Sequence, residues 1–154
     1  MEHMIVKQSA VINAPIEIVY AVLRDYEVGH RAILPEPFFE SMEVLKGGQG
    51  EGTEIFIEME VFGQEFTYHQ RVTEPIPGHQ LVERDINTGL ASTFFLEPVG
   101  ENQTRVHIES EVALSKGFQR IMEKLFNPMI IGGIFKKELQ NLADYVAKNQ
   151  VITA

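Results

Sequence analysis

The feature that most limits the possible folds is a single change of hydrophobic period near Gly117. Before it, apolar and polar residues alternate in a succession of short segments, which is the pattern of half-buried β-strands. After it, from Gly117 to about Asn149, apolar residues recur at helical spacing in one broad stripe. Strands that follow one another through short turns pair antiparallel, and the apolar face of their sheet must be covered. The long terminal helix is the element available to cover it.

The strand segments are separated by clear turn signals. The best alternation lies in residues 53–61, where Ile55, Ile57 and Met59 share one face and glutamates share the other. Phe62-Gly63-Gln64 then predicts a hairpin. The predicted strands cover residues 4–13, 41–46, 53–61, 66–72, 80–86, 90–97 and 103–114.

Helices are predicted at both ends of this run of strands. Residues 15–25 form an amphipathic pattern, and residues 26–39 allow a short second helix followed by a loop. The long terminal helix contains Pro128, which removes a backbone donor, and the pair Gly132 and Gly133, which weakens helix again. We therefore expect this helix to be interrupted near residue 128.

Length and composition exclude several classes of function. The 154 residues suit a single domain spanning 1–154, and no apolar run is long enough for a stable membrane insertion. A net charge of −9 disfavours nucleic acid as a partner. There is no cysteine and no leader-like N-terminus, so a cytoplasmic location is expected. No nucleotide fingerprint and no HExxH-type cluster occurs, so we expect neither a cofactor nor a metal.

An ordered set of short segments along nearly the whole chain resembles a known superfamily. The segments are Ile12-Asn13-Ala14-Pro15 leading into Val19-Tyr20-Ala21-Val22-Leu23, Asp25-Tyr26, Met42 to Gly48, Gly50-Glu51-Gly52-Thr53, Leu96-Glu97-Pro98-Val99 and Thr104-Arg105-Val106. In these the chain is similar to the polyketide cyclase/dehydrase and lipid-transport superfamily of START-like and birch-pollen-allergen-like domains. The resemblance implies an α+β helix-grip fold, in which about seven antiparallel strands curve around a long C-terminal helix. It also implies an internal cavity for an apolar or amphipathic ligand.

If such a cavity exists, the inward-facing residues of the strands and the apolar stripe of the helix should line it. A solid core made by the same residues is the alternative. The predicted ligand-binding residues are Ile55, Ile57, Met59, Phe66, Tyr68, Gln70, Arg84, Phe94, Ile108, Ser110, Met122, Leu125, Phe126, Met129 and Ile130.

The polar residues on these apolar faces would orient a ligand. Tyr68, Gln70 and Arg84 are expected to hold its polar end, and an inward arginine would need an anionic partner such as a carboxylate. A register error of one residue would instead place Arg84 on the solvent face. His69 and His107 lie on outward faces among other charged residues, which is typical of exposed cross-strand pairs.

Three functions remain open at this point. The first is binding of a hydrophobic small molecule such as a lipid, isoprenoid or polyketide-like compound, admitted through the 26–39 loop or the helix break. The second is a cyclase, aromatase or dehydratase, for which the acid or base candidates are His30, Tyr68 and Arg84. The third is a protein-interaction module. Either a monomer or a homodimer is compatible with the sequence.

Overall fold

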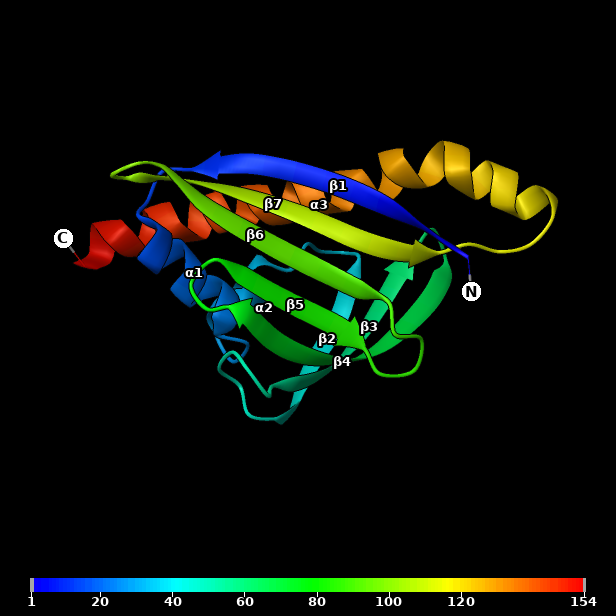
Figure 1. Ribbon diagram of the computed structural model, residues 1–154, viewed down its shortest axis with the longest axis horizontal. Coiled ribbons are helices and arrows are strands. Elements are labelled where there is room, and N and C mark those ends of the chain that lie inside the picture. Colours follow the sequence, from blue (N-terminus) through cyan, green and yellow to red (C-terminus); the bar gives the residue numbers. More distant parts are fainter. Residues whose placement is uncertain (1, 154) are drawn as a thin grey trace.

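The computed structural model describes residues 2–153, which form seven strands and three helices (Figure 1). In chain order these elements are β1 (His3–Ile12), α1 (Ile16–Arg24), α2 (Gly29–Ile33), β2 (Phe39–Lys46), β3 (Glu54–Val61), β4 (Gln64–Ile76), β5 (Gln80–Asp85), β6 (Ala91–Gly100), β7 (Gln103–Ala113) and α3 (Phe118–Thr153). The architecture is the α+β helix-grip fold that the sequence predicts.

The seven strands make one antiparallel sheet in the order β1-β7-β6-β5-β4-β3-β2. Strands β2 to β7 follow one another as a meander, and β1 joins its far edge by pairing with β7, from His3 opposite Ala113 to Ile12 opposite Thr104. The sheet curves, and α3 runs along its concave side (Figure 1). At the β3–β4 hairpin, Phe62 and Gly63 both have positive φ (49° and 81°), as a two-residue turn that matches strand twist requires.

The core lies where the second half of α3 and helices α1 and α2 meet the sheet. Leu139, Leu142 and Val146 of α3 are buried against the same cluster as Val19 and Leu23 of α1. These contacts anchor α1, α2 and the second half of α3 to the sheet.

A glycine-rich loop fixes the connection between α1 and α2. Gly50 N donates to the Arg24 carbonyl at 2.8 Å, and Tyr26 N donates to the Gly48 carbonyl at 2.9 Å. Gly48 has φ 137°, a backbone conformation that residues with a Cβ rarely adopt. The loop thereby holds Tyr26 and the start of α2 at one end of the sheet.

The expected interruption of the terminal helix was wrong. Helix α3 runs continuously through Pro128. Pro128 and Lys124, whose carbonyl loses its helical partner, are both exposed, so water can satisfy that carbonyl. None of the helices in residues 2–153 is both long and apolar enough to cross a membrane.

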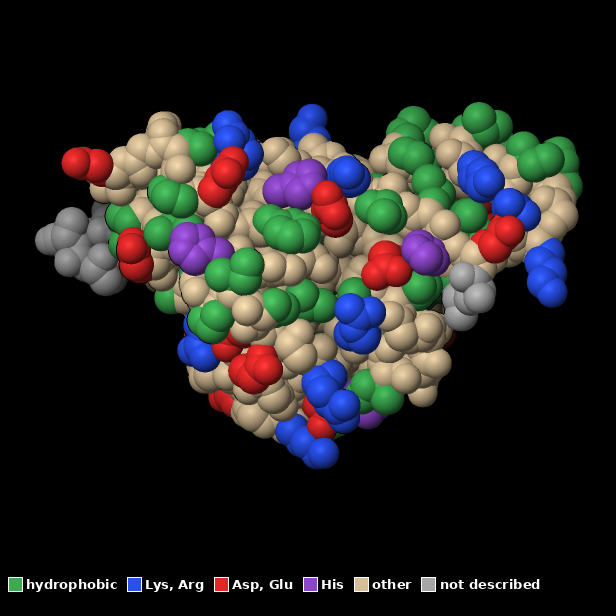
Figure 2. Space-filling view, viewed as in Figure 1, with side chains coloured by type: hydrophobic (Ala, Val, Ile, Leu, Met, Phe, Trp, Pro, Cys, Tyr) green, Lys and Arg blue, Asp and Glu red, His purple; other side chains and the backbone are tan. Residues whose placement is uncertain are grey.

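The first turns of α3 project beyond the end of the sheet (Figure 1). Six large apolar side chains are exposed there: Phe118, Ile121, Met122, Leu125, Phe126 and Met129. Figure 2 shows hydrophobic side chains and Lys or Arg gathered on this projecting segment. It therefore contributes little to the core, in contrast to the second half of the helix.

Candidate functional site

A cavity of about 340 Å³ lies between the concave face of the sheet and α3. Strands β3 to β7 supply one side, and α2 and α3 supply the other. Most of its lining is apolar: Leu34, Phe39, Ile57, Met59, Val61, Phe66, Leu90, Ala91, Phe94, Ile108, Val112, Ala113, Ile131, Ile134 and Phe135. A volume of this size is at the lower end of small-molecule sites.

A buried hydrogen-bonded cluster of Tyr26, His30 and Glu83 stands at one end of the cavity. The Tyr26 hydroxyl donates to Glu83 Oε2 at 2.7 Å, and His30 Nε2 lies 3.3 Å from the same oxygen. The His30 ring stacks on Tyr26 with centroids 4.4 Å apart and meets the edge of Phe94. These contacts hold the imidazole in one orientation.

The contacts of His30 also determine where its protons are. Nδ1 lies 2.7 Å from the Leu23 carbonyl, which can only accept, so Nδ1 carries a proton. Nε2 then faces the Glu83 carboxylate. Burial and the Glu83 carboxylate raise the pKa of Tyr26 well above its usual value, so Tyr26 remains a donor. Tyr26 and His30 therefore both face the Glu83 carboxylate at this end of the cavity.

Glu138 of α3 is the second buried acid of the cavity. Its side chain is 4% exposed, and no other described residue forms a hydrogen bond with its carboxyl group. Burial, followed by the charge of Glu83, raises its pKa to about 8. In the empty cavity at pH 7 Glu138 is therefore mainly a neutral carboxylic acid that can donate a hydrogen bond.

Asp85 also lines the cavity, but its oxygens are already occupied. It accepts from His69 N at 3.0 Å and from the backbone and hydroxyl of Thr88 at 2.8 and 2.9 Å. Asp85 thus fixes the β5–β6 turn, and its carboxylate has little capacity left for a ligand.

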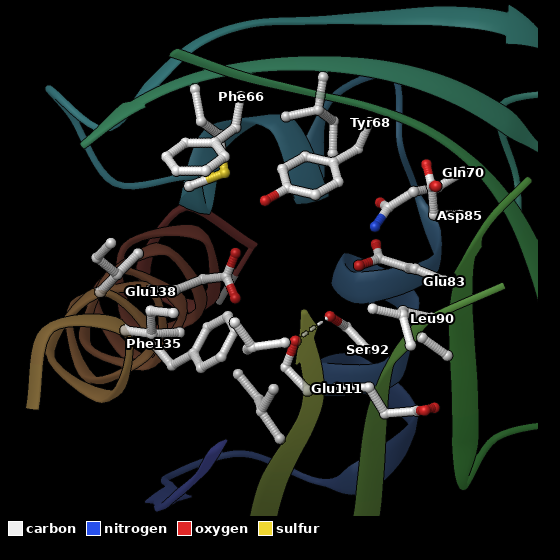
Figure 3. A pocket seen from close by; sticks show the side chains of 18 of the residues that line it. Phe66, Tyr68, Gln70, Glu83, Asp85, Leu90, Ser92, Glu111, Phe135 and Glu138 are labelled. Carbon is white, nitrogen blue, oxygen red and sulfur yellow. Dashed lines mark hydrogen bonds between the residues drawn. The ribbon is translucent and has the colours of Figure 1, made fainter. Parts of the chain in front are cut away.

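Tyr68, Gln70 and Glu138 are among the polar lining groups that remain available. Gln70 Oε1 is buried without a partner among the described residues, and no hydrogen bond joins the Tyr68 hydroxyl to any of them. Tyr68 and Glu138 point into the same space from β4 and α3 (Figure 3). Unsatisfied polar groups that converge in an apolar cavity can orient a bound molecule.

The structure brings most of the residues predicted from the strands to this cavity. Those that line it are His30, Ile57, Met59, Phe66, Tyr68, Gln70, Phe94, Ile108 and Ser110. Ile55 is fully buried in the core and does not reach the cavity. Ser110 shares a 2.7 Å hydrogen bond with Ser92, so its hydroxyl is already satisfied.

The inward orientation predicted for Arg84 was wrong by one residue. Arg84 is exposed and donates from Nη1 to the Gly89 carbonyl at 2.6 Å, while Glu83 and Asp85 face inward. Leu81 and Val82 are both buried, so apolar alternation in β5 does not define the register. The two acids occupy positions where an apolar residue is expected, and for this reason sequence reasoning missed them.

The predicted helix contribution to the cavity was also wrong. Met122, Leu125, Phe126 and Met129 are exposed, and Ile130 does not line the cavity. The helix face that does line it consists of Glu123, Asn127, Ile131, Ile134, Phe135 and Glu138. This face mixes polar and apolar residues, so a search for the most apolar stripe passes over it.

The outward histidines lie where the sequence predicts. His107 Nε2 is 3.0 Å from Glu109, and His69 Nε2 is 3.4 Å from Glu54, both on the convex face. Within the described residues, Glu40, Glu60 and Glu65 are close enough together to hold a metal ion, but all three are exposed and none lines the cavity. The cavity chemistry therefore rests on the side chains described above.

Comparison with known proteins places the whole fold in context. Residues 3–147 match the family model described as polyketide cyclase/dehydrase and lipid transport. A search of curated protein sequences finds no significant match.

Solved structures of similar fold cover almost the entire chain. The solution structure of KanY protein is 26% identical, with TM-score 0.82, over 96% of this chain and 99% of that one. A START superfamily protein from Mycobacterium smegmatis is 16% identical, with TM-score 0.73, over 96% and 99%. The Zhui aromatase/cyclase from Streptomyces sp. R1128 is 16% identical, with TM-score 0.77, over 96% and 95%. At 16% identity these likenesses concern the fold alone.

Proposed function

Because the chain belongs to the polyketide cyclase/dehydrase and lipid transport family, we propose that it binds a small, mainly apolar molecule in the cavity between the sheet and α3. The observation that carries this proposal is an enclosed space of about 340 Å³ with an apolar lining. Tyr68, Gln70 and Glu138 are available there to orient the polar end of the ligand.

Apolar burial alone would give useful affinity. A ligand that loses roughly 300 Å² of apolar surface gains roughly 7 kcal/mol at about 25 cal/mol per Å². Before the cost of association, this corresponds to about micromolar binding. No catalytic group is required for such a function.

Mass spectrometry of the purified protein tests the proposal. Native spectra should show a stoichiometric non-covalent adduct, and solvent extraction should release a largely apolar molecule. A protein that carries no adduct and binds no apolar fluorescent probe would contradict the binding function.

Acid–base catalysis is the second candidate, and one observation favours it. Glu138, with a pKa of about 8, and the neighbouring side chains of His30 and Glu83 line the same cavity. A protonated acid and a basic group in one apolar site are what a cyclisation or dehydration step uses.

The molecule that co-purifies with a Glu138→Gln variant distinguishes catalysis from simple binding. If the protein is an enzyme, the variant should carry a precursor that differs in mass or chromatographic retention from the molecule in the wild type. If the protein only binds, both proteins should carry the same molecule.

A further inference from the structure

The charged lining of the cavity has one sign. Five acidic residues are among those that line it, Glu83, Asp85, Glu111, Glu123 and Glu138, whereas no lysine or arginine of the described residues is. The side chain of Glu111 points away from the cavity, toward His3 (Figure 3). His30 is the basic side chain in the lining, and both of its nitrogens face protein acceptors, the Leu23 carbonyl and Glu83. A bound molecule therefore meets acids without a free protein cation among them.

Four of the five acids already have partners. Glu83 accepts from Tyr26, and Asp85 accepts from the β5–β6 turn. Glu123 accepts from the Ser115 backbone at 2.9 Å, and Glu111 lies 3.3 Å from His3 Nε2. Glu138 is the acid for which no such partner is found in the described part of the chain.

An independent observation involves a group that carries no charge. Gln70 lines the same cavity, is 9% exposed, and has a buried Oε1 that accepts no hydrogen bond from the described residues. An unsatisfied buried acceptor costs about 1–3 kcal/mol. The side-chain oxygens of Gln70 and Glu138 thus both accept no hydrogen bond from the described residues, and a ligand can supply the missing donors.

Resting on the binding function proposed above, we propose that the ligand carries a protonated amine, which Glu138 and Gln70 receive while its apolar part fills the rest of the cavity. An ammonium group has several donors and one positive charge, which matches an acid and an amide oxygen that both lack a donor. The aromatic faces of Tyr68 and Phe135, which line the same space (Figure 3), suit a cation as well.

The acidic lining also disfavours a ligand that carries a carboxylate. Its charge would be desolvated beside these acids with no cation to compensate it. The groups in the cavity lining that can respond to an incoming cation are Glu83 and Asp85 on β5, Tyr68 on β4, His30 on α2, and Glu123 and Glu138 itself on α3. An ammonium beside Glu138 would favour its ionised form, so binding should release a proton near neutral pH.

Three naphthyl compounds of similar size but different charge test this inference. Fluorescence titrations of the full chain at pH 8.5 would use 2-(1-naphthyl)ethylamine, 2-(1-naphthyl)ethanol and 3-(1-naphthyl)propionate. The amine should bind at least about tenfold more tightly than the alcohol, a difference of about 1.4 kcal/mol. The propionate should bind most weakly.

Two charge-neutralising variants of α3 complete the test. Glu138→Gln should remove the preference for the amine over the alcohol. Asp144→Asn, an exposed change on the same helix, should keep the preference. If the alcohol or the propionate binds as tightly as the amine, the amine inference is overturned while the binding function stands. If none of the three binds, both fail.

Discussion

Glu138 shows how a single residue can make the fold sensitive to pH. Burial raises the pKa of this carboxyl group from 4.5 to about 8, so between these values the folded protein holds a proton that the unfolded chain has lost. The free energy of unfolding should therefore fall as the pH rises through this window, by at most about 1.4 kcal/mol per pH unit.

Glu138→Gln isolates this effect, because glutamine has no proton to lose. We expect the free energy of unfolding of the variant, relative to wild type, to increase as the pH rises from 5 to 8 and to stay level above 8. Urea unfolding across this range measures the difference, with Asp144→Asn as a control for net charge. A difference that does not change with pH would contradict the role given to Glu138.

The Tyr26 hydroxyl makes a different contribution at the residue scale. Tyr26→Phe removes a buried donor and leaves Glu83 with one fewer partner, so it should lower the free energy of unfolding by about 1–3 kcal/mol. Tyr68→Phe is the matched control, because no hydrogen bond links its hydroxyl to any described residue. Equal losses in both variants, measured by urea unfolding at pH 7, would show that the Tyr26–Glu83 bond contributes nothing special.

At the element scale, the two halves of α3 have different roles. Leu139, Leu142 and Val146 are buried in the core, and Ile134, Phe135 and Glu138 line the cavity, whereas Leu125 is 65% exposed on the projecting turns. Ile134→Phe should therefore narrow the cavity and weaken binding of an apolar fluorescent probe by at least about tenfold, since overpacking a filled site costs about 1–3 kcal/mol. Leu125→Phe adds similar volume outside and should leave the affinity unchanged. Equal probe affinities in the two variants would mean that the probe binds outside the cavity.

The proline in α3 is open to test as well. Pro128→Ala restores a backbone donor toward the Lys124 carbonyl, and proline costs about 3 kcal/mol relative to alanine within a helix. We expect slower amide hydrogen exchange in residues 118–131 and little change in the buried half of the helix. Unchanged exchange in the first half would mean that other interactions already determine its order.

Elements with a strong period were predictable from the sequence, whereas the acids of the site were not. Alternation in residues 53–61 correctly predicted the inward residues Ile57 and Met59. In β5 the rule failed because the inner face carries Glu83 and Asp85, whose burial depends on hydrogen bonds from Tyr26, distant in sequence, and from Thr88 in the following turn. Glu138 was missed for the same reason, since one acid within a helical stripe gives no sign of facing an enclosed space.

At the scale of the whole molecule, the cavity leaves part of the sheet without packing partners. Filling it with a ligand that binds only the folded state stabilises that state by mass action. Protein freed of its extracted ligand should therefore have a lower Tm than the loaded protein, and re-adding the extract should restore it. Identical melting curves by differential scanning calorimetry would show that the molecule is not bound to the folded state.

The pairing of β1 with β7 delays completion of the sheet during synthesis of the chain. His3 meets Ala113, so the edge of the sheet stays incomplete until more than a hundred residues have been synthesised. The concave face stays uncovered until α3, which follows all seven strands, has been synthesised. Contacts so distant in sequence are slow to form, and apolar surface that stays open during synthesis is prone to aggregate. The surface that encloses the cavity in the folded protein is thus exposed to other proteins in the nascent chain until α3 has left the ribosome.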